Sequence, residues 1–228
     1  MIAAALDTSG PRVSLALRGP EGEIRERNYR GLGQVGTTLI PTLLSLCQEV
    51  PCRIQDIRLV AVSLGPGSFT GLRCGVATAN ALALALGLKV VGVPSLEVIA
   101  HSVATPCRRI LCLSPHRRGS FYASLFRREG ERWIPESPIE VGPLGEIIAA
   151  LPAAPEVVCG PEEAAGELES ITLPGDSPDF LVTYPSAAAL LRLAEAAGAE
   201  AAGRFALPLY VRASQPEEKD KARGNGKG

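Results

Sequence analysis

Residue types that carry metal and acid–base chemistry are scarce in this sequence. Only two histidines, His101 and His116, occur among its 228 residues, and neither belongs to an H-x3-H or H-x2-E pair. Such spacings are typical of zinc-binding side chains on a helix. We therefore interpret both histidines as solvated surface residues and predict no metal site. Aromatic residues are also few, at 4%, so aliphatic side chains must fill the core.

The sequence has no excess of charge of either sign. Its 23 Lys and Arg residues are balanced by 24 Asp and Glu residues, which leaves a formal net charge of −1. No overall electric field would therefore draw the protein to a phosphate backbone or an anionic membrane. This balance argues against a stand-alone nucleic-acid-binding protein.

The cysteine pattern and the hydrophobic runs exclude two further classes. No C-x2-C pair occurs, and two pairs are spaced C-x4-C; the six cysteines are Cys47, Cys52, Cys74, Cys107, Cys112 and Cys159. We interpret them as small buried hydrophobic residues with reduced thiols. The apolar run at 74–88 is interrupted by polar residues and glycine, and is too weak for a membrane span. With no signal-peptide pattern at the start, we expect a cytoplasmic protein.

Hydrophobic periodicity predicts an α/β protein. In the first half we expect strands at 2–8, 12–18, 22–30, 57–64 and 89–93, and helices at 34–50, 69–86 and 95–104. In the second half we expect strands at 108–114, 120–128, 132–137 and 156–159, and helices near 143–151 and 186–198. Pro41 is expected early in its helix, where a missing N–H is tolerated.

The order of these elements predicts two lobes of related design. Three antiparallel strands precede alternating helices and strands, and a second group of strands followed by helices loosely repeats this opening. Actin-like ATPases and sugar kinases (the ASKHA, ribonuclease H-like fold) have this layout, in which each lobe holds a mixed sheet flanked by helices. We expect an N-terminal lobe at 1–105, a smaller C-terminal lobe at 106–215 whose last helix or strand packs back on the first lobe, and a disordered tail at 216–228.

The segment LDTSG at residues 6–10 fits the first phosphate loop of such a fold. Asp7 could orient a hydrated metal ion, and Thr8 and Ser9 could donate hydrogen bonds to phosphate. The same residues are common in an ordinary hairpin, where their side chains bond to their own backbone. Both interpretations stay open at the level of these five residues.

The segment GPGSFTG at residues 65–71 matches none of three enzyme loops. It lacks the lysine of a P-loop, has one residue too many for a dinucleotide loop, and misplaces the serine of a nucleophile elbow. A tight strand-to-helix turn remains, with Ser68 or Thr70 as the cap. The helix then presents small residues at every fourth position, and a second helix inside the chain or in another subunit could pack on them: Gly71, Gly75, Ala79 and Ala83.

Five segments together resemble the TsaB family, also called YeaZ. They are ALDTS at 5–9, GPGSFTGLRCGVATANALA at 65–83, VVGVPSLEVIA at 90–100, RRGSFYASLF at 117–126 and LPLYVR at 207–212. The resemblance covers most of residues 1–128, and GPGSFTGLR is its most specific part. Two stretches depart from the family pattern, at 35–37 and at 115–116, where a His-Ser-Gln-like stretch and an Asp-Ala pair are expected.

This resemblance implies a non-catalytic subunit without a cofactor. It would bind TsaD, the enzyme that transfers a threonylcarbamoyl group to N6 of adenosine 37 in tRNAs reading codons that begin with A. TsaE would complete the assembly, tRNA would be contacted only through the complex, and the chain alone would form a homodimer. Asp7, Thr8 and Ser9 would be a vestigial phosphate loop. The partner interface would come from two helices, through Leu39, Leu43, Thr70, Gly71, Leu72, Gly75, Val76, Ala79 and Ala83.

A charged side chain at Gly75 or Ala79 is accordingly expected to break assembly without unfolding the monomer. The alternative function is an actin-like ATPase or a sugar-kinase-type enzyme that uses Asp7 in a working phosphate loop. A peptidase is a third possibility, for which the sequence offers no nucleophile or zinc pattern.

Overall fold

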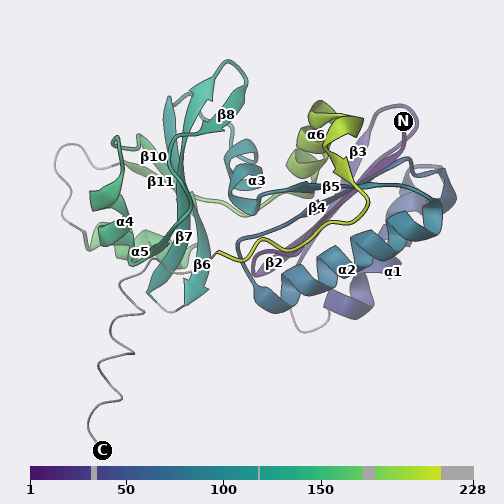
Figure 1. Ribbon diagram of the computed structural model, residues 1–228, viewed down its shortest axis with the longest axis horizontal. Coiled ribbons are helices and arrows are strands. Elements are labelled where there is room, and N and C mark those ends of the chain that lie inside the picture. Colours follow the sequence, from purple (N-terminus) through teal and green to yellow (C-terminus); the bar gives the residue numbers. More distant parts are fainter. Residues whose placement is uncertain (32–34, 118, 172–177, 212–228) are drawn as a thin grey trace, which may run out of the picture.

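The chain folds around two mixed β-sheets, each flanked by helices (Figure 1). The computed structural model describes residues 1–31, 35–117, 119–171 and 178–211. The tail predicted at 216–228 lies outside these residues. We call the half built on the first sheet lobe 1 and the other half lobe 2.

The sheet of lobe 1 has the strand order β12-β5-β4-β1-β2-β3. Strands β1, β4 and β5 are parallel, and β2, β3 and β12 run antiparallel to their neighbours. The strands are β1 (Ala3–Asp7), β2 (Arg12–Arg18), β3 (Ile24–Arg30), β4 (Leu59–Ser63), β5 (Val90–Val93) and β12 (Ala202–Gly203). The five strands expected in the first half are confirmed within two residues at each end, and β12 was not predicted.

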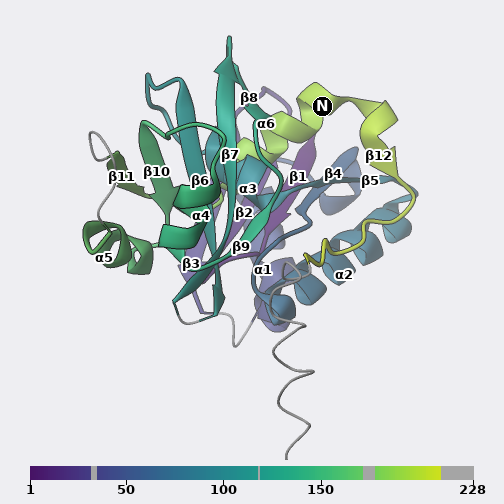
Figure 2. The same cartoon turned by 60° about the vertical axis from the view of Figure 1, so that its left-hand side comes forward.

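Helices bury both faces of this sheet. Helices α1 (Val35–Glu49) and α2 (Phe69–Leu86) cover one face, and α6 (Ala187–Ala197) covers the other. Figure 2 shows α1 and α2 on one side of the strands. Because successive strand residues point to opposite faces, Ala4 and Leu6 pack towards α1 and α2, while Ala3 and Ala5 pack towards α6. Pro41 lies inside α1 rather than in its first turn.

Lobe 2 is built on the order β11-β10-β6-β7-β8, with β9 paired to β7. Its strands are β6 (Arg109–Arg117), β7 (Ser120–Glu129), β8 (Arg132–Pro135), β9 (Glu140–Gly142), β10 (Val157–Gly160) and β11 (Asp179–Val182). Helices α4 (Leu144–Ala150) and α5 (Glu163–Glu169) cover one face. The sequence predicted β6, β7, β8, β10 and α4, but not β9, α5 or β11.

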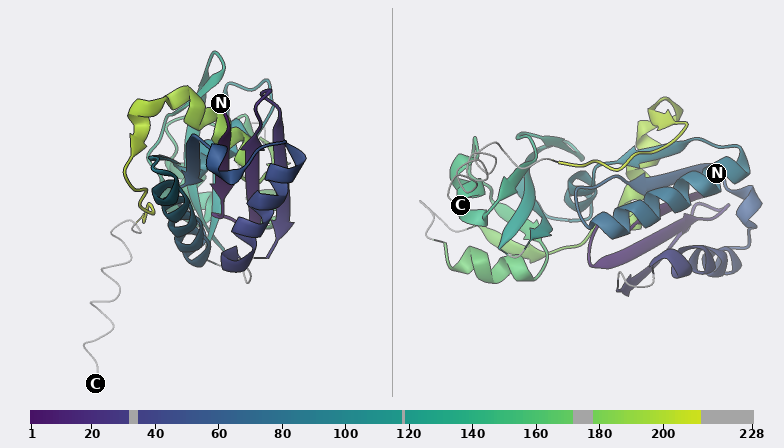
Figure 3. Two further views of the ribbon diagram at one scale, coloured as in Figure 1. Left: turned by 90° about the vertical axis from the view of Figure 1, so that its right-hand side faces the viewer. Right: turned by 60° about the horizontal axis from the view of Figure 1, so that its bottom comes forward.

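Two segments join the lobes or return to lobe 1. Helix α3 (Ser95–His101) places Leu96 and Ile99 in the core of lobe 2, while its Val98 lies in the core of lobe 1. After a short 3-10 turn (Ala199–Ala201) and β12, residues 204–211 run along α2 (Figure 3). We call residues 204–211 the C-terminal strap. A second 3-10 turn (Ile54–Asp56) precedes β4.

Candidate functional site

The predicted phosphate loop, residues 7–9, begins at the last residue of β1 and is closed on itself. The backbone N–H and the hydroxyl of Ser9 both donate to the Asp7 carboxylate, at 3.0–3.1 Å. The Thr8 hydroxyl donates to the carbonyl of Gly71, at 2.8 Å. Asp7 and Thr8 are fully buried, and Ser9 is 1% exposed. The three side chains expected to serve a phosphate or a metal ion therefore bond to the protein instead.

The carboxylate of Asp7 lies in an environment that disfavours its charge. Burial raises the pKa of Asp7 to about 6, although hydrogen bonds from Ser9 lower it. A carboxylate that orients a hydrated metal ion must be both ionised and reachable. Asp7 is fully buried, so it does not face an open ligand site in this conformation.

The glycine-rich turn at 65–68 packs against this loop. The N–H of Ser68 donates to the carbonyl of Ser9 at 2.7 Å, and a Cβ on Gly67 would collide with the same carbonyl. Ser68 caps α2 by accepting a hydrogen bond from the N–H of Gly71, at 3.2 Å, and Gly87 ends α2 in the left-handed conformation. Glycine at 67 is therefore required by the close approach of two backbones, as is usual where glycine lines a tight contact.

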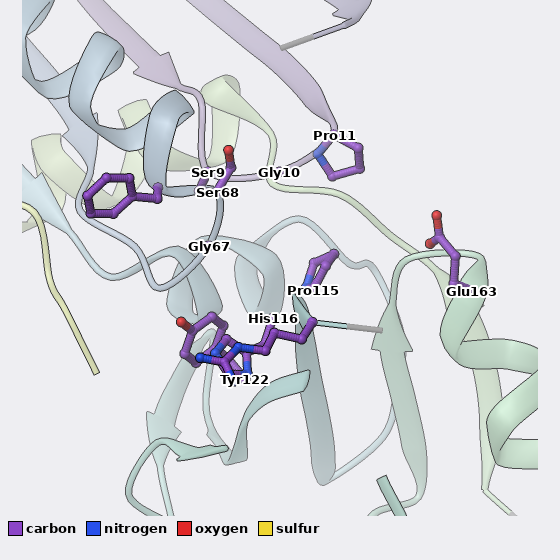
Figure 4. A pocket seen from close by; sticks show the side chains of 11 residues that line it. Ser9, Gly10, Pro11, Gly67, Ser68, Pro115, His116, Tyr122 and Glu163 are labelled. Carbon is purple, nitrogen blue, oxygen red and sulfur yellow. The ribbon is translucent and has the colours of Figure 1, made fainter. Parts of the chain in front are cut away.

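A hollow of about 610 Å³ lies between the lobes above this turn (Figure 4). Ser9, Gly10 and Ser68 line its lobe 1 side, and His116, Tyr122 and others line its lobe 2 side. The ring of His116 packs against that of Tyr122 in a tilted arrangement, with 4.7 Å between centroids and 57° between the ring planes. The nucleotide of an actin-like ATPase would have to enter between such lobes, but here the hydroxyl groups of residues 8 and 9 are engaged by Gly71 and Asp7.

The prediction that both histidines are solvated is wrong for His101 and incomplete for His116. His101 is half-buried between α3 and β8; its Nδ1 lies 3.0 Å from the Glu97 carbonyl, and its Nε2 accepts from the N–H of Trp133 at 3.3 Å. Burial lowers the pKa of His101. His116 is also half-buried, beside Tyr122. Sequence spacing could not find these contacts, because Trp133 is 32 residues from His101. Among the described residues, no three His, Cys, Asp or Glu side chains form a group that could hold a metal ion.

The residues predicted for a partner interface are mostly internal. Thr70 is exposed, but the other eight are buried within the chain: Leu39, Leu43, Gly71, Leu72, Gly75, Val76, Ala79 and Ala83. The small residues of α2 let this helix approach the sheet, since a Cβ on Gly75 would collide with the hydroxyl of Thr8. The expectation that a charge at Gly75 or Ala79 spares the monomer is therefore wrong, because both positions are in the core of lobe 1.

The outer faces of the same helices are apolar and exposed. Within the part of the chain that the structure describes, eight of the ten exposed large hydrophobic residues lie on α1, α2 and the C-terminal strap: Ile40, Leu44, Phe69, Leu84, Phe205, Leu207, Leu209 and Tyr210. We call these eight residues the outer apolar surface. The sequence did not single them out, because apolar residues such as Phe69 and Leu84 occur on the exposed side of α2 as well as on its buried side.

Hydrogen bonds hold the C-terminal strap along α2. The Asn80 amide bonds to both the N–H and the carbonyl of Ala206, at 2.9 and 3.0 Å, and the N–H of Leu209 donates to the carbonyl of Leu64. The guanidinium of Arg73 stacks 3.8 Å from the centroid of the Phe69 ring. Its Nε donates to the Tyr210 hydroxyl at 3.3 Å. The strap and the first turn of α2 thus form one continuous surface.

Helix α2 is, by length and composition alone, apolar enough to cross a membrane. It has 18 residues and a mean hydropathy of 1.3, and 39% of that stretch is buried within the chain. Its buried residues pack against β4 and α1 in the core of lobe 1. These contacts are those of a core helix, and a core helix passes the same test of length and composition.

Comparison with known proteins identifies relatives of this chain. A model of the family described as TsaD, tRNA N6-adenosine threonylcarbamoyltransferase, matches residues 36–157. The tRNA threonylcarbamoyladenosine biosynthesis protein TsaB of Bacillus subtilis is 31% identical over 123 residues, which are 54% of each protein. The aligned part of the chain thus spans about half the length of this relative.

Solved structures extend the similarity to nearly the whole chain. YeaZ from Pseudomonas aeruginosa superposes with a TM-score of 0.79 at 25% identity, covering 92% of this chain and 99% of that one. The ethanolamine utilization protein EutJ from Carboxydothermus hydrogenoformans superposes with a TM-score of 0.51 at 11% identity over 85% of this chain and 90% of that one, which shows a shared fold alone. The two-sheet architecture is the actin-like fold that the sequence predicted.

Proposed function

The chain belongs to the TsaD-like family, as a TsaB (YeaZ) member, and from this we propose that it is a non-catalytic partner subunit in the biosynthesis of threonylcarbamoyladenosine in tRNA. In this proposal it binds TsaD, and TsaE joins the complex. It contacts tRNA only through the complex, acts in the cytoplasm and forms a homodimer when TsaD is absent.

The observation that carries the proposal is the outer apolar surface. Exposed apolar side chains that gather on one face commonly mark a site where another protein binds. On α1 and α2 this surface includes Ile40, Leu44 and Leu84, which are 39%, 44% and 66% exposed. Tyr210, Phe69 and Arg73 add residue types that often dominate binding energy at protein interfaces. A partner that packs a pair of helices on α1 and α2 would cover this surface.

The closed loop at 7–9 supports a role without catalysis. In a working phosphate loop, hydroxyl and backbone donors must be available to the ligand. Here the Thr8 and Ser9 hydroxyls are used within lobe 1, and Asp7 is fully buried. The loop instead ties β1 to the first turn of α2, which positions the helix that we propose to carry the partner.

Light scattering coupled to size exclusion tests this function. The chain is run alone, with cognate TsaD, and with TsaD, TsaE and ATP. We expect a homodimer alone and a stable one-to-one complex with TsaD. Leu84→Glu should weaken the complex about tenfold or more, because it places a charge within an apolar contact.

The matched control is Val182→Glu, which changes another exposed apolar residue, 54% exposed, on β11 of lobe 2. It should bind TsaD as the unchanged chain does. If no complex forms under any of these conditions, the partner function is wrong. Saturable ATP turnover by the chain alone, lost in Asp7→Ala, would favour the ATPase or sugar-kinase alternative instead.

A further inference from the structure

Two cysteines meet at the C-terminal end of α1. The N–H of Cys52 donates to the carbonyl of Cys47 at 3.3 Å, across a span of five residues. A bond of this span closes many helix ends, and the side chains at its two ends commonly touch. Here the side chains of both residues line one hollow, and each thiol shifts the pKa of the other. The C-x4-C spacing at 47–52 thus places two thiols together at one helix end.

Both thiols border an open hollow of about 800 Å³. Its lining includes Leu44, Cys47, Pro51, Cys52 and Asp56. Cys47 is 5% exposed, whereas Cys52 is half-buried. A small molecule in this hollow can therefore reach Cys52 first and Cys47 through it. The setting differs in lobe 2, where Cys112 and Cys159 are fully buried.

We propose that Cys47 and Cys52 are a reversible disulfide site, at which a low-molecular-weight disulfide oxidises the pair and a low-molecular-weight thiol reduces it. The backbone bond between the two residues and the hollow that both line place the thiols at the same helix end, so the disulfide can close within this segment. This inference is independent of the proposed partner function, because it rests on α1 of the chain alone.

The exchange proceeds in two balanced steps. Cys52 loses its proton to water, and its thiolate attacks one sulfur of the small disulfide; the S–S bond breaks, and the released thiolate takes up a proton. Cys47 then attacks the Cys52 sulfur, and its own proton goes to the second small thiol as that thiol leaves. One small disulfide is reduced to two thiols, and two protein thiols are oxidised to one disulfide.

The unequal environments of the two thiols set this order. Burial raises the pKa of Cys47 to about 12, and burial also raises the pKa of the more exposed Cys52. Because the thiolate is the attacking species, Cys47 is a poor nucleophile towards a disulfide in solution. Once Cys52 carries a mixed disulfide, the proximity of Cys47 to it compensates for the low reactivity of the Cys47 thiol. We therefore expect slow formation of the first bond and no accumulation of the mixed disulfide.

The experiment incubates the full chain with graded ratios of oxidised to reduced glutathione. Free thiols are then blocked by alkylation, and the products are read by intact mass and peptide mapping. The expected product has lost two hydrogens, joins the peptides that contain Cys47 and Cys52, and carries no glutathione on either. Reduced glutathione in excess should reverse it completely.

Three variants separate the steps. Cys47→Ser should accumulate one glutathione on Cys52, because the resolving thiol is gone, and Cys52→Ser should leave Cys47 unmodified. Cys74→Ser removes a half-buried cysteine from α2 and should form the same internal bond as the unchanged chain. Retention of glutathione on Cys52 in the unchanged chain would overturn the proposal, as would an unreactive Cys52 under conditions that modify Cys74. Both outcomes are read from the unchanged chain, whether or not the variants fold.

Discussion

The two lobes fill the space around their sheets with different side chains. In lobe 1 the central strands combine alanines with leucines and valines but bury no aromatic residue; the buried alanines are Ala3, Ala4, Ala5, Ala16 and Ala61. In lobe 2 the corresponding strands contribute large residues, namely Ile110, Leu111, Leu113, Phe121, Phe126 and Trp133. A sequence with few aromatic residues has placed most of its buried ones in lobe 2.

This difference has a functional meaning under the proposed role. Gly67 and Gly75 let α2 and the loop at 7–9 approach closely, so an added side-chain atom at either position would collide with Ser9 or Thr8. Large residues fill lobe 2 by volume, so it is sensitive to the loss of atoms. The lobes also differ outside, since the exposed apolar residues gather on lobe 1. The lobe that we propose to offer a partner surface is also the one in which a Cβ on Gly67 or Gly75 would collide with the loop at 7–9.

The largest expected effect is the loss of a bulky side chain from lobe 2. Trp133 is 6% exposed and lies in the core between α3 and the sheet. Trp133→Ala should lower the free energy of unfolding by roughly 3–5 kcal/mol, because it leaves a cavity. Urea unfolding measures this change. The control is Phe69→Ala, at a 54% exposed aromatic residue of lobe 1, which should lower the free energy of unfolding by less than about 1 kcal/mol. Equal losses of stability in the two variants would contradict the view that the core of lobe 2 depends on its large buried side chains.

The next effect concerns the buried carboxyl group of lobe 1. Asp7 has a pKa of about 6 in the folded chain, raised by burial from 3.8. The folded state therefore retains a proton that the unfolded state has lost, and stability falls as pH rises from about 4 to above 6. Asp7→Asn replaces the titrating carboxyl group with a neutral amide, so this pH-dependent loss of stability should disappear in the variant. From pH 4 to pH 8, the variant should gain about 2.4 kcal/mol of stability relative to the unchanged chain.

Thermal unfolding at a series of pH values measures that gain. Asp179→Asn, at an exposed carboxylate that begins β11 in lobe 2, is the matched control. A constant difference between Asp7→Asn and the unchanged chain over the whole pH range would show that the carboxyl group is not disfavoured in its charged form. The burial of Asp7 would then carry no penalty for its charge, and the hydrogen bonds from Ser9 would be sufficient to stabilise the carboxylate.

A smaller effect compares a glycine in a helix of each lobe. A Cβ on Gly75 of α2 would collide with Thr8, whereas a Cβ on Gly166 of α5 would meet nothing within 4 Å. Gly75→Ala should destabilise the chain by about 1–3 kcal/mol, because Thr8 is buried and bonded to Gly71. Gly166→Ala should stabilise it by up to about 1 kcal/mol through helix propensity. Changes of the same sign in urea unfolding would contradict the close packing of α2.

The sequence predicted α2 to the residue because its boundaries have local causes. Ser68 supplies the cap and Gly87 the left-handed end, and both are readable within a few positions. Strands β9 and β11 were missed because they are 3 and 4 residues long and are defined by their neighbours in the sheet. Helix α5 was missed because its 7 residues have a glycine near the centre.

The candidate site was less predictable than the fold, and the reason is physical. A face of small residues reads the same in sequence whether it packs on its own sheet or on another subunit. Gly75 faces the interior of its own lobe because it packs against Thr8, which lies 67 positions earlier in the sequence. The outer apolar surface likewise depends on the strap, whose contact with Asn80 spans 126 positions. Local pattern carries no signal for either contact.

The smallest expected effect tests whether the lobes also differ at their helix ends. Ser186 caps α6 of lobe 1 by accepting a hydrogen bond from the N–H of Ala189, at 3.3 Å, while Glu162 at the start of α5 in lobe 2 makes no such bond. Ser186→Ala should therefore cost about 1 kcal/mol in urea unfolding. Glu162→Ala should cost only a few tenths, since it removes only a charge near the helix end. The Ser186 hydroxyl also donates to Glu26 on β3, at 2.9 Å. A loss well above about 1 kcal/mol for Ser186→Ala would therefore show that this contact between α6 and the sheet adds to the stability of lobe 1. Equal losses for Ser186→Ala and Glu162→Ala would show that the caps of the two lobes do not differ.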